Sequence, residues 1–145
     1  MEIMIIKRAK NQRDDIAAIL SAQNLPADDL PKVLDNFFVA LDSENIIGVI
    51  GLEIYGAYGL LRSLAVIPEY RNKGVAGKLI ERLESLAALK GLTALYLFTE
   101  TAPEYFAAKF FKKITRNEMP EELKQSSEFS HVCPESAIVM KKLLS

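Results

Sequence analysis

A short run of basic and small residues, from Arg71 to Lys78, has the composition of an anion-binding loop. An apolar segment ends just before the run, and an amphipathic segment begins inside it at Val75. The first backbone N–H groups of a helix have no partner within the helix and carry the positive end of its dipole. Gly74 lets an anion approach the backbone closely, and Lys73 adds positive charge. The run therefore predicts a site for a phosphate-bearing ligand, with an ordinary strand-to-helix turn as the alternative.

Composition excludes several other kinds of site. The phosphate-binding motifs Gly-x-x-x-x-Gly-Lys-Ser/Thr and Gly-x-Gly-x-x-Gly are absent. Eighteen basic and 19 acidic residues give a net charge of −1, which does not favour nucleic acid as a partner. One cysteine, Cys133, and one histidine, His131, predict neither an intrachain disulfide nor a metal site. The apolar runs are too short for a membrane span or a signal peptide, so the expected location is cytoplasmic.

The order of apolar segments predicts the elements that must position the loop. A helix is predicted from an N-cap at Asn11 to Pro26, a second from Val75 to a glycine cap at Gly91, and a short third from about Ala102 to Phe111. Residues 26–35 are predicted as a loop or short helix. The predicted strands are Ile3–Ile6, Phe37–Leu41, Ile46–Tyr55, Leu60–Ile67, Ala94–Thr99 and Ala137–Met140.

These elements predict an α/β (α+β) fold in one domain over residues 1–145. Three consecutive strands with short turns form an antiparallel meander. The strand–helix–strand order that follows makes Leu60–Ile67 and Ala94–Thr99 parallel neighbours. The expected sheet is mixed, mostly antiparallel, with about six to seven strands and helices on both faces.

The segment Val66–Ala76 resembles the signature of the GCN5-related N-acetyltransferases, the GNAT family. That signature is Arg/Gln-x-x-Gly-x-Gly/Ala after a strand ending Val-x-Pro-x-x, and Arg71, Gly74 and Ala76 match it. The element order over nearly the whole chain is also similar to that of the family. The resemblance implies acetyl-CoA as the co-substrate and no metal.

The resemblance also implies a role for particular residues. The amides from Arg71 to Ala76 would hold the pyrophosphate, and the backbone of Leu64–Val66 would pair with the pantetheine arm where two strands splay apart. The helix around Ala102–Phe110 would flank the acetyl end. The implied cofactor-binding residues are Leu64, Ala65, Val66, Arg71, Asn72, Lys73, Gly74, Val75, Ala76, Thr99 and Phe106.

The chain departs from the family pattern at the acetyl end. Phe106 stands where many members have a tyrosine that protonates the departing thiol, Phe110 replaces a glycine, and Thr99 replaces an asparagine. Acid catalysis of this kind contributes about 10²–10⁴-fold, so its loss slows the reaction without abolishing it. A backbone N–H near Val66 would still polarise the acetyl carbonyl.

The acceptor is predicted to be a small amino-acid-like amine. An α-amine with a pKa of about 8 is roughly one-tenth neutral at pH 7, whereas a lysine side chain with a pKa of about 10.4 is almost wholly charged. Glu53 is the candidate base, with a solvent-facing carboxylate as the alternative. Arg62 and Ser63 are candidate substrate-binding residues, and Arg62 paired with Glu53 is the structural alternative.

The segment Leu97–Ala102 and the tail Ser127–Ala137 resemble, more weakly, the amino-acid N-acetyltransferases related to N-acetylglutamate synthase and the small GNATs found with arsenic-resistance genes. His131 as a base and Cys133 as a nucleophile are less favoured than plain loop roles. The rival functions are acetylation of a protein N-terminus and a non-catalytic CoA-binding sensor. The sequence does not determine the oligomeric state, and the resemblance leaves a homodimer open.

Overall fold

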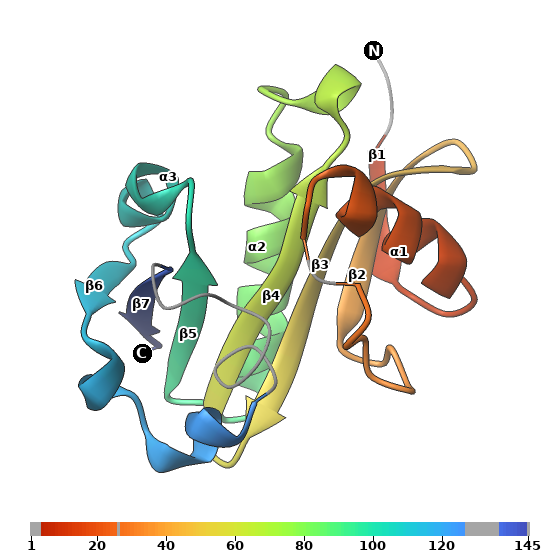
Figure 1. The fold of residues 1–145 in the computed structure, drawn as a ribbon. Helices are drawn as coiled ribbons and strands as arrows, with labels where there is room; N and C mark the ends of the chain where they lie inside the picture. The colour runs from red at the N-terminus through yellow and green to blue at the C-terminus, as the bar shows by residue number, and fades with distance from the viewer. Residues whose placement is uncertain (1–3, 26, 127–136, 145) are drawn as a thin grey trace. The chain divides into compact units, whose positions relative to one another are not determined.

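A seven-stranded sheet with strand order β1-β2-β3-β4-β5-β7-β6 forms the framework of this computed structural model (Figure 1). The structure describes residues 4–25, 27–126 and 137–144. The mixed, mostly antiparallel sheet confirms the predicted fold class. The strands are β1 Met4–Arg8, β2 Phe37–Asp42, β3 Asn45–Tyr55, β4 Tyr58–Val66, β5 Ala94–Thr99, β6 Lys112–Ile114 and β7 Ile138–Leu143.

Three α-helices and three short 3-10 helices complete the described elements. The α-helices are α1 Arg13–Ala22, α2 Val75–Leu89 and α3 Pro103–Ala108. None of the helices in the described part of the chain has the length and apolar character that crossing a membrane requires. The 3-10 helices are Pro68–Tyr70, Arg116–Glu118 and Glu121–Gln125.

The chain divides into two compact units. The first unit is Met1–Leu52 with Ser63–Leu86, and the second is Glu53–Arg62 with Ala87–Ser145. The single domain expected over residues 1–145 stays a prediction.

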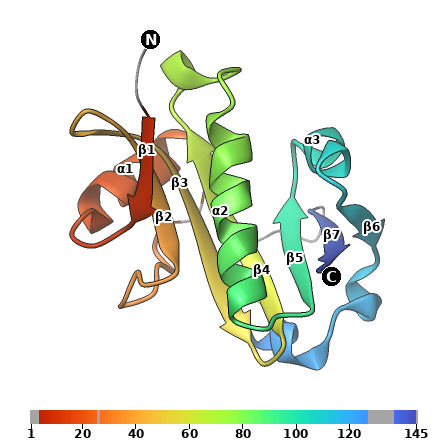
Figure 2. The same cartoon turned by 180° about the vertical axis from the view of Figure 1, so that it is seen from behind.

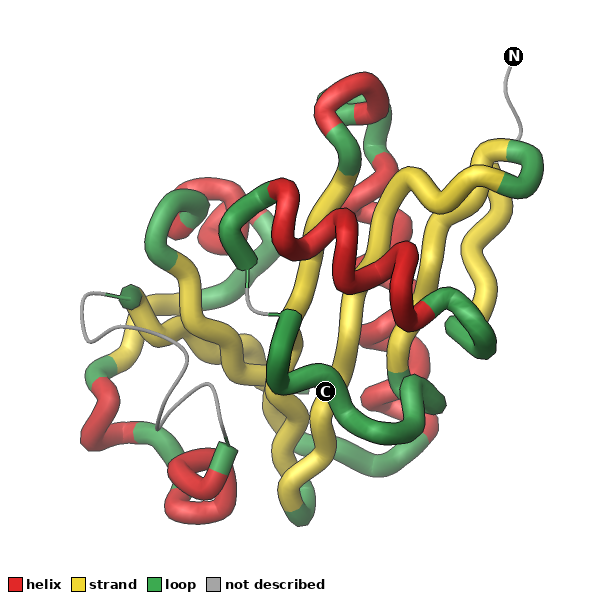
Figure 3. The backbone as a smooth tube through the Cα atoms, turned by 45° about the vertical axis from the view of Figure 1, so that its right-hand side comes forward, coloured by secondary structure: helices red, strands yellow, loops and turns green. Residues whose placement is uncertain are grey.

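In the first unit, helices cover both faces of the strands (Figures 1 and 2). Successive residues of a strand face opposite sides, so Gly48 and Val49 of β3 face different helices. A Cβ built on Gly48 would meet side chains of α2, whereas Val49 shares a buried cluster with Ile16 and Leu20 of α1. Figure 3 shows α1 lying across the strands of this unit.

In the second unit, β5 pairs with β4 on one side and with β7 on the other. The β4–β5 pairing is parallel, as predicted, and runs from Tyr58↔Ala94 to Leu60↔Tyr96. Strand β7 continues antiparallel to β6. The core of this unit contains Leu60, Ala94, Tyr96, Met119, Leu123 and Val139.

Most predicted elements are confirmed, and the errors lie at element ends and in short elements. Helix α1 begins at Arg13 with Gln12 as its N-cap, so the Asn11 cap is wrong by one residue. Helix α3 ends at Ala108 rather than near Phe111, because the chain turns left-handed at Phe110 with φ +75°. The described part of 26–35 contains no helix. Strand β6 was not predicted, because Lys112–Ile114 has neither the length nor the apolar alternation of a typical strand.

Candidate functional site

The loop between β4 and α2 contains two left-handed residues. A 3-10 turn at Pro68–Tyr70 leads into the loop, and the amide of Arg71 donates to the Pro68 carbonyl at 3.2 Å. Asn72 and Gly74 are left-handed, with φ of +64° and +82°. Glycine adopts this conformation without the steric cost that other residues carry. The sequence therefore places its glycine where the turn into α2 requires one.

The amides of this loop are open to a ligand. Among the described residues, the N–H groups of residues 72–77 donate to no carbonyl or side chain, and residues 71–74 are exposed. A Cβ built on Gly74 would meet no atom within 4 Å. Because the Arg71 amide is already used within the turn, Arg71 could contribute only its guanidinium. The geometry suits an anion held by several amides at the start of a 15-residue helix.

Strand β4 presents one backbone edge next to this loop. The amide of Ile67 donates to the Ile47 carbonyl of β3 at 2.9 Å. The N–H and C=O groups of one strand residue point to the same side and alternate along the strand, so those of Val66 point away from β3. Residues Leu61–Val66 continue β4 past its last parallel pair, Leu60↔Tyr96.

Two features of this edge were not predicted from the sequence. Ser63 has φ of +60° inside β4, a conformation typical of a β-bulge. The carbonyl of Val66 accepts hydrogen bonds from Gln23 Nε2 at 2.9 Å and from Arg71 Nε at 3.2 Å. A serine carries no sequence signal for a left-handed strand residue, and Gln23 is 43 residues away from Val66.

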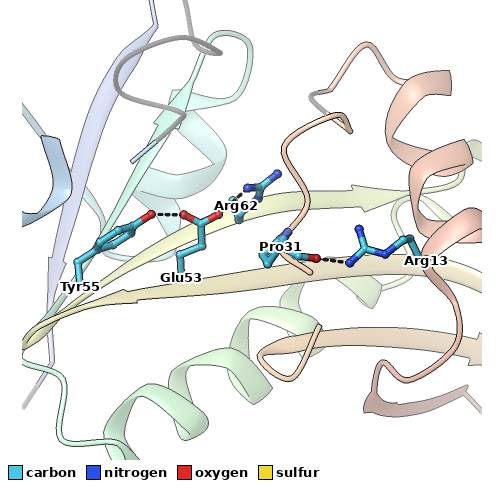
Figure 4. Close-up of polar contacts among 5 residues, drawn as sticks. All are labelled: Arg13, Pro31, Glu53, Tyr55 and Arg62. Carbon is cyan, nitrogen blue, oxygen red and sulfur yellow. Dashed lines mark hydrogen bonds and ion pairs between the residues drawn. The ribbon is translucent and has the colours of Figure 1, made fainter. Parts of the chain in front are cut away.

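In the second unit, Glu53 is held between Arg62 and Tyr55 (Figure 4). Arg62 Nη1 lies 2.5 Å from Glu53 Oε2, and the Tyr55 hydroxyl donates to Glu53 Oε1 at 2.5 Å. The Arg62 side chain is fully buried and that of Glu53 is 14% exposed. The structural pair that the sequence left open is therefore present, and Glu53 does not face solvent freely. The roles of Glu53 as base and Arg62 as substrate ligand stay predictions.

Figure 4 also shows Arg13 donating to the Pro31 carbonyl, in the first unit. The same guanidinium group reaches the Lys32 carbonyl at 2.8 Å. These two bonds fix the irregular segment after α1 to the start of that helix.

The candidate residues of the acetyl end occupy β5 and α3. Phe106 is buried and stacks edge-on against Phe111 and Tyr105, with ring centroids 5.8 and 5.4 Å apart. Burial raises the pKa of the neighbouring Tyr105 hydroxyl, so this group keeps its proton at neutral pH. The Thr99 hydroxyl accepts from the Ala102 amide at 3.1 Å and so fixes the turn into α3.

The structure thus gathers the predicted residues into two groups. The first unit holds the β4 edge and the loop, and the second holds Glu53, Arg62, Thr99 and Phe106. His131 and Cys133 lie outside the described residues. In residues 4–25, 27–126 and 137–144, no three His, Cys, Asp or Glu side chains lie close enough together to bind a metal ion.

Sequence comparisons match this chain to acetyltransferases. The model of the acetyltransferase (GNAT) family matches residues 8–115. An uncharacterized N-acetyltransferase of Chlorobaculum tepidum is 29% identical over 89 residues, which are 61% of this chain and 57% of that protein. An amino-acid acetyltransferase of Pseudomonas fluorescens is 36% identical over 62 residues, 43% of this chain and 14% of that enzyme. The chain thus spans less than two thirds of the length of either relative.

Solved structures share the fold. N-acetylglutamate synthase from Neisseria gonorrhoeae, complexed with coenzyme A and N-acetyl-glutamate, superimposes with a TM-score of 0.84 at 18% identity, over 100% of this chain and 36% of that one. A Mycobacterium tuberculosis protein in complex with CoA gives a TM-score of 0.82 at 20% identity, over 97% of this chain and 99% of that one.

Proposed function

The chain belongs to the acetyltransferase (GNAT) family, and from this premise we propose that it transfers the acetyl group of acetyl-CoA to the amine of a small amino-acid-like substrate. The observation that carries the proposal is the set of open amides at residues 72–77, inside the segment that the family model matches. Relatives named as amino-acid acetyltransferases support the class of acceptor. The class of acceptor is also supported by the larger neutral fraction of an α-amine at pH 7 compared with a lysine side chain.

The loop after β4 would hold the diphosphate of the co-substrate. The N–H groups of residues 72–76 supply donors, and the positive end of the α2 dipole stabilises the charge. Arg71 and Lys73 are exposed beside these amides and add two positive charges. The space next to Gly74 is open to the ligand, since a Cβ built on this glycine would have no atom within 4 Å.

The outer edge of β4 would hold the pantetheine arm. Leu64 and Val66 alternate with Ala65 along the strand, so their backbone groups share the edge that faces away from β3. The Val66 N–H would polarise the acetyl carbonyl as the amine nitrogen attacks the carbonyl carbon. The carbon–sulfur bond then breaks, sulfur leaves with the electron pair as thiolate, and the nitrogen releases one proton to a base or to water.

Glu53 is the proposed base and Arg62 the proposed ligand of the substrate carboxylate. Glu53 already accepts from Arg62 and Tyr55, so it would take up the proton through its hydrogen-bond network and not as a free carboxylate. The Arg62 guanidinium is fully buried and paired with Glu53. It would therefore bind the substrate carboxylate while it also keeps Glu53 as a partner. A plain ion pair remains the competing role for both residues.

A non-catalytic CoA-binding module is the second candidate function. It is favoured by Phe106, which is buried at the position where many family members carry an acidic hydroxyl. Thiol release from acetyl-CoA, measured with a panel of amino acids, separates the two functions. Turnover with any amino acid supports the enzyme, whereas binding of CoA without turnover supports the sensor.

Gly74→Glu tests the placement of the cofactor. The substitution places a negative charge and a side chain among the amides, and like charges brought together cost several kcal/mol, so CoA affinity should fall by more than about 100-fold in calorimetric titration. Gly91→Glu is the matched control, because Gly91 has a similar φ of +76° and is also open, but lies after the other end of α2. Gly91→Glu should bind CoA like the wild type. Equal affinities for both variants would place the diphosphate elsewhere.

A further inference from the structure

The Val66 carbonyl is saturated by side chains. An amide carbonyl has two lone pairs, and here Gln23 Nε2 and Arg71 Nε each donate to it, at 2.9 and 3.2 Å. All three residues belong to the first unit. Because its carbonyl is already used, Val66 can bind a ligand on the outer edge of β4 through its backbone N–H. The carbonyl cannot accept from the co-substrate unless one of the two donors leaves.

Gln23 reaches this carbonyl from a fixed position. Ile16 and Leu20 anchor α1 and are fully buried. The helix ends just before Gln23, whose amide donates to the Leu20 carbonyl at 3.1 Å. Asn24 then turns left-handed with φ of +59°, and the Leu25 amide returns to the same Leu20 carbonyl at 2.9 Å. This closed helix end restricts the backbone that carries the Gln23 side chain.

We propose that Gln23 is a positioning residue for acyl transfer, which fixes the end of β4 so that the Val66 N–H points at the acetyl carbonyl. The inference rests on the proposed function, because it assumes that the thioester lies along this edge. Arg71 is the weaker support of the two donors, since its bond is longer and its side chain is exposed. Gln23 is only partly exposed and comes from a helix held by the core.

The orientation of one N–H matters because hydrogen bonds weaken steeply away from linearity. Negative charge develops on the acetyl carbonyl oxygen during the reaction, and a donor N–H stabilises this charge best when the N–H already points at that oxygen. Gln23 does not touch the reacting atoms, and acetyl-CoA would be bound mainly through its diphosphate by the loop after β4. Loss of Gln23 should therefore lower kcat and leave the KM for acetyl-CoA nearly unchanged.

Gln23→Met tests this role by removing the donor at similar side-chain size. We expect kcat to fall by about 10-fold or more, as small misplacements at a reacting centre do, with the KM for acetyl-CoA within about twofold of the wild type. Gln23→Lys restores a donor and should recover part of kcat. Gln12→Met is the matched control at the other end of α1, where the Gln12 side chain accepts from the Lys10 amide, and it should leave both constants unchanged.

The outcomes separate this inference from the proposed function. A wild type that binds CoA and turns over, with Gln23→Met at the same kcat and only a lower Tm, overturns the positioning role and leaves the function intact. A wild type without acetyl transfer to any amine overturns both. If Gln23→Met does not fold, Gln23→Asn carries the same test, since its amide is one methylene too short to reach the carbonyl.

Discussion

At the scale of single residues, the ion pair between Glu53 and Arg62 is central to the proposed acceptor site. A fully buried guanidinium requires a negative partner, because an unpaired charge in the interior is costly. Glu53 supplies that partner at 2.5 Å and also accepts from Tyr55. Each of the two residues therefore stabilises the other in the fold, whether or not either takes part in the reaction.

Glu53→Gln should affect both stability and rate. The amide keeps the shape of the side chain but removes the negative charge that pairs with the buried Arg62 guanidinium, so the free energy of unfolding should fall by about 3 kcal/mol or more in denaturant titration. If Glu53 is the base, kcat should also fall and the pH dependence of the rate should change. A pH–rate profile identical to that of the wild type would remove Glu53 as the base.

Two further variants separate the two roles of Glu53. Tyr55→Phe removes one hydrogen bond to the carboxylate and keeps the ion pair, so it should cost about 1–2 kcal/mol. Replacing Glu53 and Arg62 together by leucine removes both charges and should regain most of the lost stability. Recovered activity in that double variant would show a structural pair, whereas a stable but inactive double variant would show that Glu53 or Arg62 takes part in the reaction.

At the scale of elements, the end of α3 carries an unusual residue. Phe110 is left-handed with φ of +75°, and the residue is 78% exposed. This conformation costs a residue with a Cβ about 1–2 kcal/mol relative to glycine. Lys142 Nζ lies 5.6 Å from the ring centroid, and such a contact at an exposed site returns only about 0.5–1 kcal/mol.

Phe110→Gly and Phe110→Ala measure this backbone strain directly. Both remove the ring and its contact with Lys142, but only glycine removes the Cβ. The glycine variant should therefore be more stable than the alanine variant by about 1 kcal/mol, read from the two free energies of unfolding. If alanine proved equal to glycine, the helix end would not be strained at this residue.

At the scale of the whole molecule, close packing between strands depends on small residues. Gly51 of β3 pairs with Phe37 of β2, and a Cβ on Gly51 would lie 2.5 Å from the ring of Phe37. That ring belongs to a buried residue, because Phe37 is only 1% exposed. The phenylalanine thus covers its glycine partner and fills the space that a side chain would occupy.

Gly51→Ala should destabilise the protein by about 1–3 kcal/mol, because the added carbon overlaps a buried ring. Gly48→Ala is the comparison, since its Cβ would lie no closer than 3.2 Å to any neighbouring atom and should cost less. Thermal unfolding of both variants measures the difference. Adding Phe37→Leu should rescue Gly51→Ala, and a failure of that rescue would show that the ring is not the cause.

Long elements with a regular pattern were predictable, and short elements paired across the chain were not. Apolar periodicity predicted α2, β5 and the meander, because these elements are long and their patterns are set by local sequence. The predicted glycine cap at Gly91 is confirmed by its φ of +76°. The short strand β6 was missed, since three residues carry too little pattern and their pairing with β7 comes from distant sequence.

By itself, the sequence determined the long elements, the parallel pairing of β4 with β5, and the loop before α2, because each follows from local patterns and from the chirality of connections. The tertiary structure alone decided that Arg62 pairs with Glu53, that Ser63 is left-handed, and that Gln23 bonds to the Val66 carbonyl. These features join residues that are far apart in the chain or are forced by packing, and no local pattern encodes a partner 43 residues away.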